Sequence, residues 1–140
     1  MVVRILTLED YDAYHTLINE FRPTIFTKEQ FQNCLEYIRR TGELWVLEED
    51  GILVATGTIL YEKKLIFNTC VYAHIEDVCV KQTERGKGYG KTIVRHLLEE
   101  TKRNGCHKVT LDCSDENVGF YIACGLTKRG NQMCELVQYL

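Results

Sequence analysis

The sequence has very little proline, no long apolar run and only a small excess of charge. Pro23 is its one proline, and no stretch approaches the roughly 20 apolar residues that a membrane-spanning helix needs. The net charge of −3 is a poor electrostatic match for nucleic acid. No repeat, low-complexity stretch or glycine-rich linker divides the chain. We therefore expect one domain over residues 1–140, because this length and an apolar content of 45% suit a single core.

The seven cysteines lack the spacing of a metal site or of a disulfide framework. No two of them form a Cys-x-x-Cys pair, and their number is odd. Most lie in apolar runs, where a free cysteine acts as a small hydrophobic residue. The N-terminal segment contains the acidic residues Glu9 and Asp10, and it lacks the long apolar stretch of a signal peptide. We expect a cytoplasmic chain that uses no metal ion.

The spacing of apolar residues and the turn residues predict alternating helices and strands. Thr27 and Gln30 form a capping box, which marks the start of the second helix. Gly51 follows Asp50 in a turn that is typical of a β-hairpin. The expected elements are a strand at Val2–Leu6, a helix from Leu8 to about Glu20, a helix from Thr27 to Gly42, strands at Leu44–Leu47, Ile52–Tyr61 and His74–Val80, a helix from Gly90 to about Asn104, a strand at Lys108–Cys113, a short helix from Ser114 to Cys124, and strands at Leu126–Lys128 and Met133–Tyr139. This order predicts an α/β fold.

A glycine-rich segment, Arg85-Gly86-Lys87-Gly88-Tyr89-Gly90-Lys91, lies between a predicted strand and a predicted helix. Glycines let the backbone approach a ligand closely, and the free N–H groups of a helix start favour phosphate oxygens. A Walker loop would need glycine where Arg85 stands, and the dinucleotide fingerprint fails at its third glycine. The residues fit an anion-binding loop, and they fit a glycine-rich turn with solvated lysines equally well.

Val78-Cys79-Val80 followed by Arg85-x-x-Gly88-x-Gly90 resembles the acetyl-CoA signature of the GNAT superfamily of N-acetyltransferases. The resemblance implies the GNAT fold, a mixed and mostly antiparallel central sheet flanked by about four helices. It implies acetyl-CoA as co-substrate, with the pyrophosphate on the loop amides and the pantetheine arm along the preceding strand. The cofactor-binding residues implied in this way are Val78, Cys79, Val80, Arg85, Gly86, Lys87, Gly88, Tyr89, Gly90 and Lys91.

A longer pattern is similar to one family within this superfamily, the glucosamine-6-phosphate N-acetyltransferases. The pattern comprises the segment 74–78, Gly105-Cys106-x-Lys108, and the run from Leu111 to Gly125. The similarity implies transfer of acetyl to the 2-amine of D-glucosamine 6-phosphate by direct attack in a ternary complex. It implies that Tyr121 assists the departing thiolate and that Asn117 contacts CoA. It also implies a homodimer in which C-terminal strands help to build a shared site.

Three carboxylates interrupt otherwise apolar strands, namely Glu76, Asp77 and Asp112. A carboxylate in such a place costs free energy unless it has a partner or borders a polar cavity. Simple alternation places Glu76 and Asp77 on opposite faces of their strand. By the resemblance, these two border the sugar and Asp112 orients its amine, so with Tyr121 they form the expected catalytic set. The proton of the amine leaves through Asp112 or through an ordered water near Glu76, two routes that the sequence leaves open.

An anionic acceptor needs cations. By the resemblance, Lys64 and Lys108, with His107 beside Lys108, match positions that line the substrate site in the family, either in the same subunit or in a neighbouring one. Relatives often carry an arginine in the final strand where this chain has Leu136. We hypothesise that Arg22 supplies this charge; the alternative is an ordinary surface arginine.

Two other functions fit parts of the sequence. A different amine acceptor, such as a polyamine, an aminoglycoside or a protein terminus, would suit an acidic groove, and the lysines argue against it. A non-catalytic acyl-CoA-binding module would keep the loop from Arg85 to Gly90, but it would not need Tyr121 and Asp112 together. A measured turnover with an amine acceptor would distinguish an enzyme from such a binding module.

Overall fold

A five-stranded sheet forms the centre of the computed structural model, which describes residues 1–138 and 140. The strands follow the order β1-β2-β3-β4-β5; every neighbouring pair is antiparallel except β4 and β5, which are parallel. The strands are β1 (Val2–Ile5), β2 (Gly42–Glu49), β3 (Ile52–Lys63), β4 (Val71–Val80) and β5 (Lys108–Thr110). This arrangement confirms the expected mixed and mostly antiparallel sheet.

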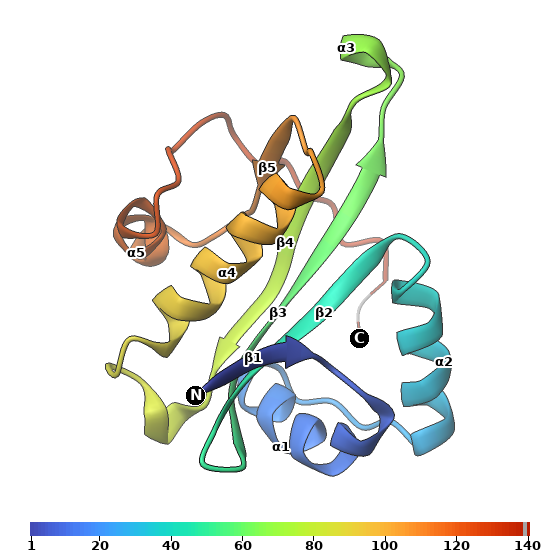
Figure 1. Cartoon of the computed structure of the whole chain (residues 1–140), viewed down its shortest axis with the longest axis vertical. Coiled ribbons are helices and arrows are strands. Elements are labelled where there is room, and N and C mark those ends of the chain that lie inside the picture. The colour runs from blue at the N-terminus through green and yellow to red at the C-terminus, as the bar shows by residue number, and fades with distance from the viewer. Residues whose placement is uncertain (139) are drawn as a thin grey trace.

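Helices cover both faces of the sheet (Figure 1). One face carries α1 (Tyr11–Phe21) and α2 (Lys28–Ile38), and the other carries α4 (Tyr89–Arg103) and α5 (Val118–Ala123). A single turn, α3 (Ile66–Thr69), forms the tip of the long β3–β4 hairpin, which projects from the body. Short 3₁₀ turns occupy Leu8–Asp10, Gln82–Glu84 and Asp115–Asn117. Within the described residues, none of the helices combines the length and the apolar character that a bilayer crossing requires.

The core lies on both sides of the sheet because both helical layers present an apolar face to it. On one side, Leu17 of α1 and Leu35 of α2 are almost completely buried. On the other side, Ile93 and Leu97 of α4 have no exposed surface. Close packing of α4 on β3 depends on Gly57, where a Cβ would lie 2.6 Å from Cδ1 of Leu97. Helical spacing of apolar residues therefore predicted the buried faces correctly.

The capping box at the start of α2 is formed as expected. The Gln30 amide donates to Oγ1 of Thr27 at 3.2 Å, and the Thr27 amide donates to Oε1 of Gln30 at 2.8 Å. The helix ends at Ile38, however, and Gly42 already belongs to β2. A Cβ at Gly42 would lie 2.3 Å from the carbonyl oxygen of Ile59 on β3, so this glycine permits strand pairing rather than ending the helix.

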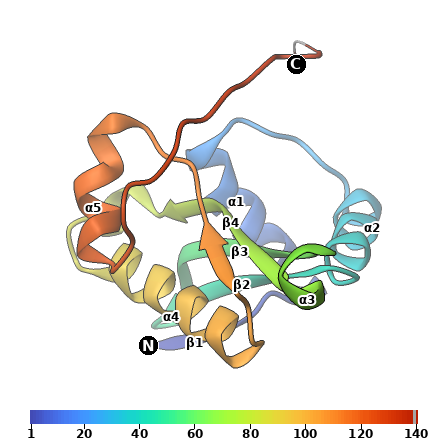
Figure 2. The same ribbon diagram turned by 90° about the horizontal axis from the view of Figure 1, so that it is seen from above.

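The C-terminal segment differs from the sequence prediction. The strands expected at Leu126–Lys128 and Met133–Tyr139 are not formed in the described part of the chain. Tyr139 itself lies outside the described residues. The segment leaves the body (Figure 2), and the side chains of Met133 and Val137 are 91% and 89% exposed. Apolar alternation makes a strand only where a neighbouring strand supplies hydrogen bonds, and this segment pairs with no described strand. The prediction of these two strands was wrong for the isolated chain.

Candidate active site

The glycine-rich segment forms a tight loop at the start of α4. Gly86 and Gly88 have φ angles of +81° and +88°, in the left-handed region that side chains disfavour. Gly88 is the N-cap residue, and α4 begins at Tyr89. The N–H groups in the first turn of a helix lack helical partners and carry a partial positive charge. The loop therefore has the geometry of an anion site, as its sequence predicts.

Gly90 brings three elements into contact at this point. A Cβ on Gly90 would lie 3.2 Å from Cζ of Phe120 on α5 and 3.2 Å from Cγ2 of Val80 on β4. This spacing is tighter than ordinary van der Waals contact, so only glycine lets α4 start so close to α5 and to the end of β4. This contact holds the glycine loop together with the end of β4 and with α5.

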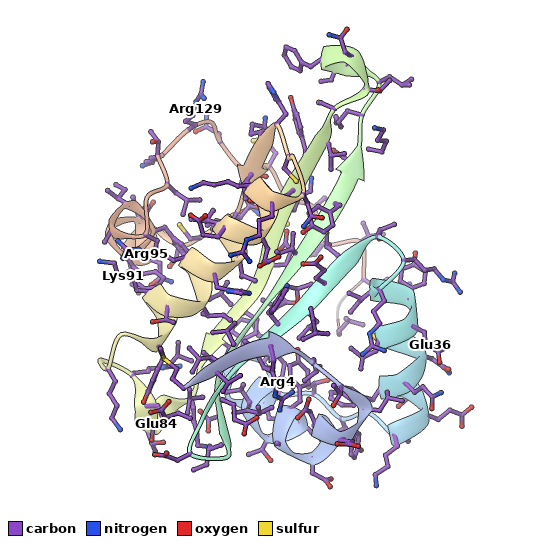
Figure 3. The ribbon with its side chains drawn as sticks, in the orientation of Figure 1. Arg4, Glu36, Glu84, Lys91, Arg95 and Arg129 are labelled. Carbon is purple, nitrogen blue, oxygen red and sulfur yellow. The ribbon has the colours of Figure 1, made fainter. Side chains whose placement is uncertain are left out.

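The charged residues of the loop point in different directions. Nζ of Lys87 lies 2.7 Å from Oε2 of Glu84, an ion pair that lowers the pKa of the Glu84 carboxyl. Nε of Arg85 donates to the carbonyl oxygen of Val80 at 3.4 Å, which is a weak hydrogen bond. Lys91 and Arg95 lie on the side of α4 that faces α5 (Figure 3). Arg85 and Lys91 thus remain available for phosphate oxygens beside the loop.

The strands β4 and β5 part near the middle of β4. Their register pairs Tyr72 with Lys108 and His74 with Thr110, where β5 ends, whereas β4 continues to Val80. Within the described structure, the last part of β4 has no strand partner on this side. Such an open edge can pair with an extended chain that carries amide groups. The expected strand Lys108–Cys113 is shortened to three residues by this parting.

The residues Val78, Cys79 and Val80 can contribute only their backbone to a ligand on this edge. Cys79 is buried, and its Sγ lies 3.7 Å from the carbonyl oxygen of Leu17 on α1. Val78 and Val80 pack into the core against α4. The side chains stabilise the fold, and the outward N–H and C=O groups form the exposed edge.

A β-bulge at Asp77 corrects the expected alternation. Thr58 pairs with Glu76 and Thr56 with Cys79, so two residues of β4 lie opposite one residue of β3. Asp77 has a φ of +51°, an uncommon value for a residue other than glycine. Because the bulge changes the alternation, Glu76 and Asp77 border the same cavity, and the prediction that they occupy opposite faces was wrong.

This cavity, of about 690 Å³, lies between the α1–α2 layer and the sheet. Its walls are mainly apolar, and Glu76, Asp77 and Arg22 are the charged residues on its border. The guanidinium of Arg22 lies 4.7 Å from the ring centroid of Phe21, and its Nη1 donates to the carbonyl oxygen of Phe21 at 2.9 Å. Arg22 thus shares the cavity with two of the expected site carboxylates.

The third carboxylate, Asp112, lies two residues beyond β5, and its charge acts on Glu76. Partial burial, together with the negative charges of Asp77 and Asp112, raises the pKa of Glu76. Oδ2 of Asp112 accepts a hydrogen bond from Nε2 of Gln132 at 2.9 Å. Gln132 was not among the predicted site residues, because an isolated glutamine in an irregular segment gives no periodic or motif signal.

Tyr121 approaches the same end of the sheet from α5. It is half-buried against the core beneath α4, and burial raises the pKa of its hydroxyl, with smaller contributions from the thiols of Cys113 and Cys124. The hydroxyl is therefore protonated at neutral pH. Asn117 lies one turn earlier, where its Nδ2 donates to Oγ of Ser114 at 3.2 Å.

Three of the four basic residues expected at the substrate site form a separate group around Tyr72. Nζ of Lys108 and of Lys64 lie over the ring of Tyr72, and the ring of His107 stacks near it. Glu76 is four residues further along β4, a separation of about 13 Å at the usual rise of a strand. Lys64, His107 and Lys108 are thus brought together with one another but not with the carboxylates, whereas Arg22 borders the cavity of Glu76 and Asp77.

Known proteins resemble this chain in sequence and in fold. The sequence profile described as "Acetyltransferase (GNAT) family" matches residues 8–126. The glucosamine 6-phosphate N-acetyltransferase of Candida albicans is 37% identical over 136 residues, which are 93% of this chain and 91% of that protein. The protein of the same name from Arabidopsis thaliana is 43% identical over 112 residues, or 76% of this chain and 75% of the relative. A crystal structure of the Arabidopsis thaliana glucosamine-6-phosphate N-acetyltransferase matches with a TM-score of 0.93 at 36% identity, and 98% of each chain is covered. The chain therefore belongs to the acetyltransferase (GNAT) family and, within it, to the family of the glucosamine 6-phosphate N-acetyltransferases.

Proposed function

We propose that this protein transfers the acetyl group of acetyl-CoA to the 2-amine of D-glucosamine 6-phosphate, giving N-acetylglucosamine 6-phosphate. Relatives that carry this activity in their names cover most of the chain. The observation that carries the proposal is the cavity bordered by Glu76 and Asp77 at the bulge of β4, just beyond the point where β4 and β5 part, with the charge of Asp112 acting on Glu76. The glycine loop follows the end of the same strand, and Tyr121 lies near Cys113, the neighbour of Asp112, so a site for a phosphate-bearing carrier lies along β4 from the acidic site.

Acetyl-CoA fits the loop and the open strand edge. The amides from Arg85 to Lys91 would hold the pyrophosphate at the start of α4. The backbone from Val78 to Val80 would pair with the amide groups of the pantetheine arm. Asn117 would contact CoA from the turn before α5. These contacts place the thioester near the point where the strands part.

The amine would be held and deprotonated by the carboxylates. Asp112 orients the amine. Glu76, whose pKa is raised, takes up the proton of the amine directly or through a water molecule. The amine nitrogen forms a bond to the acetyl carbon while the carbon–sulfur bond breaks. A backbone N–H at the bulge of Asp77 and Val78 stabilises the charge on the carbonyl oxygen, and Tyr121 protonates the thiolate. Both substrates are bound together, and no cysteine is acetylated.

The phosphate of the acceptor would be bound by Lys64, His107 and Lys108, with Arg22 on the border of the cavity. The separation of the cations from the carboxylates along β4 favours a homodimer in which a second copy completes the site. The exposed apolar side chains of the C-terminal segment, such as Met133 and Val137, suit contact with that copy. We also propose that residues 1–140 act as one domain in the cytoplasm, without a metal ion.

Initial-velocity kinetics and product analysis test this proposal. Intersecting lines in double-reciprocal plots, and a product with the mass of N-acetylglucosamine 6-phosphate, are expected for direct attack in a ternary complex. Parallel lines would indicate an acetylated enzyme and would contradict the mechanism. Light scattering under the assay conditions should give the mass of a dimer, and a monomer with full activity would contradict the shared site.

A further inference from the structure

Tyr72 lies in the middle of a row of side chains that crosses three strands. Its register partners are Glu62 on β3 and Lys108 on β5. Residues directly opposite each other on neighbouring strands point to the same face of a sheet, so their side chains can interact. The half-buried ring of Tyr72 therefore separates a carboxylate on one side from an ammonium group on the other.

Two ammonium groups lie over this one ring. Nζ of Lys108 is 4.3 Å from the ring centroid of Tyr72, and Nζ of Lys64 is 5.2 Å from it. Both distances are within the range of about 6 Å at which an aromatic ring attracts a cation. Lys64 also pairs with Glu62 at 2.9 Å, whereas Lys108 has no carboxylate within ion-pair distance among the described residues. The ring is thus the shared neighbour of both lysines.

The position of the ring is fixed by its surroundings. The ring of His107 is nearly parallel to that of Tyr72, with 16° between the planes and 5.9 Å between the centroids. On the hairpin tip, Phe67 stacks in turn on His107, with centroids 4.8 Å apart. The His107 amide donates to the carbonyl oxygen of Val71 at 2.8 Å, which anchors this stack to β4. The ring can therefore act as a rigid platform for flexible lysine side chains.

From this geometry we infer that Tyr72 is a positioning residue for the phosphate of the acceptor. Each ammonium group is attracted to the face of the ring, so the ring restricts where the two lysine side chains can lie. A phosphate group that approaches this ring then finds ammonium groups already in place, and less side-chain freedom is lost on binding. This inference rests on the proposed function, and it adds a residue that makes no ion pair itself.

The test is steady-state kinetics on Tyr72→Leu and Tyr72→Phe with glucosamine 6-phosphate and with glucosamine. Tyr72→Leu should raise the KM for glucosamine 6-phosphate by about three- to tenfold, the size expected for a lost cation–π contact at a partly exposed site. The turnover number, the KM for acetyl-CoA and the rate with glucosamine should stay within about twofold. Tyr72→Phe keeps the ring and should restore the wild-type KM.

Tyr37→Leu is the matched control, because Tyr37 carries the guanidinium of Arg40 over its ring at 5.7 Å on the outer side of α2. This variant should leave every kinetic constant unchanged. If Tyr72→Leu unfolds, Tyr72→Met replaces it, because methionine also removes the ring and its longer side chain fills more of the space. Tyr72→Met should then raise the KM for glucosamine 6-phosphate by about three- to tenfold, and an unchanged KM would overturn the inference.

Three results would overturn the inference. The first is an unchanged KM for glucosamine 6-phosphate in Tyr72→Leu. The second is an equal rise in Tyr72→Phe, which would assign the effect to the hydroxyl. The third is a parallel change in all kinetic constants, which would indicate a structural role. Absence of wild-type turnover with glucosamine 6-phosphate would instead refute the proposed function itself, and the role of Tyr72 would fall with it.

Discussion

Gln132 donates a hydrogen bond from Nε2 to Oδ2 of Asp112 at 2.9 Å, which ties the C-terminal segment to the carboxylate beyond β5. We expect Gln132→Ala to lower kcat/KM for the amino sugar by about threefold to tenfold, because a hydrogen bond to a charged group orients Asp112. Asn131→Ala is the control, since Asn131 is exposed and makes no side-chain hydrogen bond within the described residues. Equal kinetics in the two variants would show that Gln132 does not orient Asp112.

Glu76 should make folding less favourable at neutral pH. Its pKa is raised by partial burial and by the charges of Asp77 and Asp112, so the folded protein resists its ionisation. Below the ordinary glutamate pKa of about 4.3 this effect is absent, and stability is lost as the pH rises through the raised value. Glu76→Gln should therefore raise the melting temperature at neutral pH, and much less at about pH 4, while it lowers turnover.

The control for this prediction is Glu135→Gln, since Glu135 is exposed in the C-terminal segment and has no ion pair among the described residues. Its melting temperature should match that of the wild type at both pH values. A Glu76→Gln variant that melts at or below the wild-type temperature at neutral pH would contradict the repulsion among the three carboxylates.

Gly90 and Gly119 offer a matched pair of glycine substitutions at the cofactor site. A Cβ at Gly90 would lie 3.2 Å from atoms of Phe120 and Val80, whereas a Cβ at Gly119 meets nothing within 4 Å. Gly90→Ala should cost about 1–3 kcal/mol of stability and raise the KM for acetyl-CoA, because α5 must move away from α4. Gly119→Ala, inside a helix, should be neutral or stabilising by up to about 1 kcal/mol. Calorimetry and the KM for acetyl-CoA check both, and equal effects would show that the contact is unimportant.

Local sequence signals predicted the elements that position the loop. The capping box of Thr27 and Gln30, the turn at Gly51 and the apolar face of α4 depend on residues close in the chain, and all three are present. The family resemblance added the chemistry of the loop and of the strand before it. These features are readable because each is set by neighbours within one or two turns.

Features that depend on distant partners could not be predicted in this way. The bulge at Asp77 arises from pairing with β3, and its positive φ falls on an aspartate rather than on a glycine. The run Phe67 to Thr69 is also left-handed, without any glycine to signal it. Met133–Tyr139 has the alternation of a strand, yet no neighbouring strand is described for it. Pattern alone does not supply the missing partner.

Tyr121 should matter for chemistry more than for binding. Burial raises its pKa above the ordinary value of about 10, so the hydroxyl keeps its proton and can give it to the departing thiolate. Tyr121→Phe should lower kcat by about 10²-fold, the size expected for loss of a general acid, and change the KM for acetyl-CoA little. Tyr37→Phe, on the exposed side of α2, should match the wild type. Unchanged turnover in Tyr121→Phe would remove this residue from the mechanism.

The most direct test of the central claim is the rate of CoA release from acetyl-CoA with glucosamine 6-phosphate and with glucosamine. We predict rapid release with the phosphorylated sugar and a kcat/KM at least about tenfold lower with glucosamine, because the lysines beside Tyr72 then have no phosphate to bind. Galactosamine 6-phosphate, spermidine and a lysine peptide complete the comparison. Release only with spermidine or the peptide would contradict the acceptor, and no release with any amine would contradict an acetyltransferase.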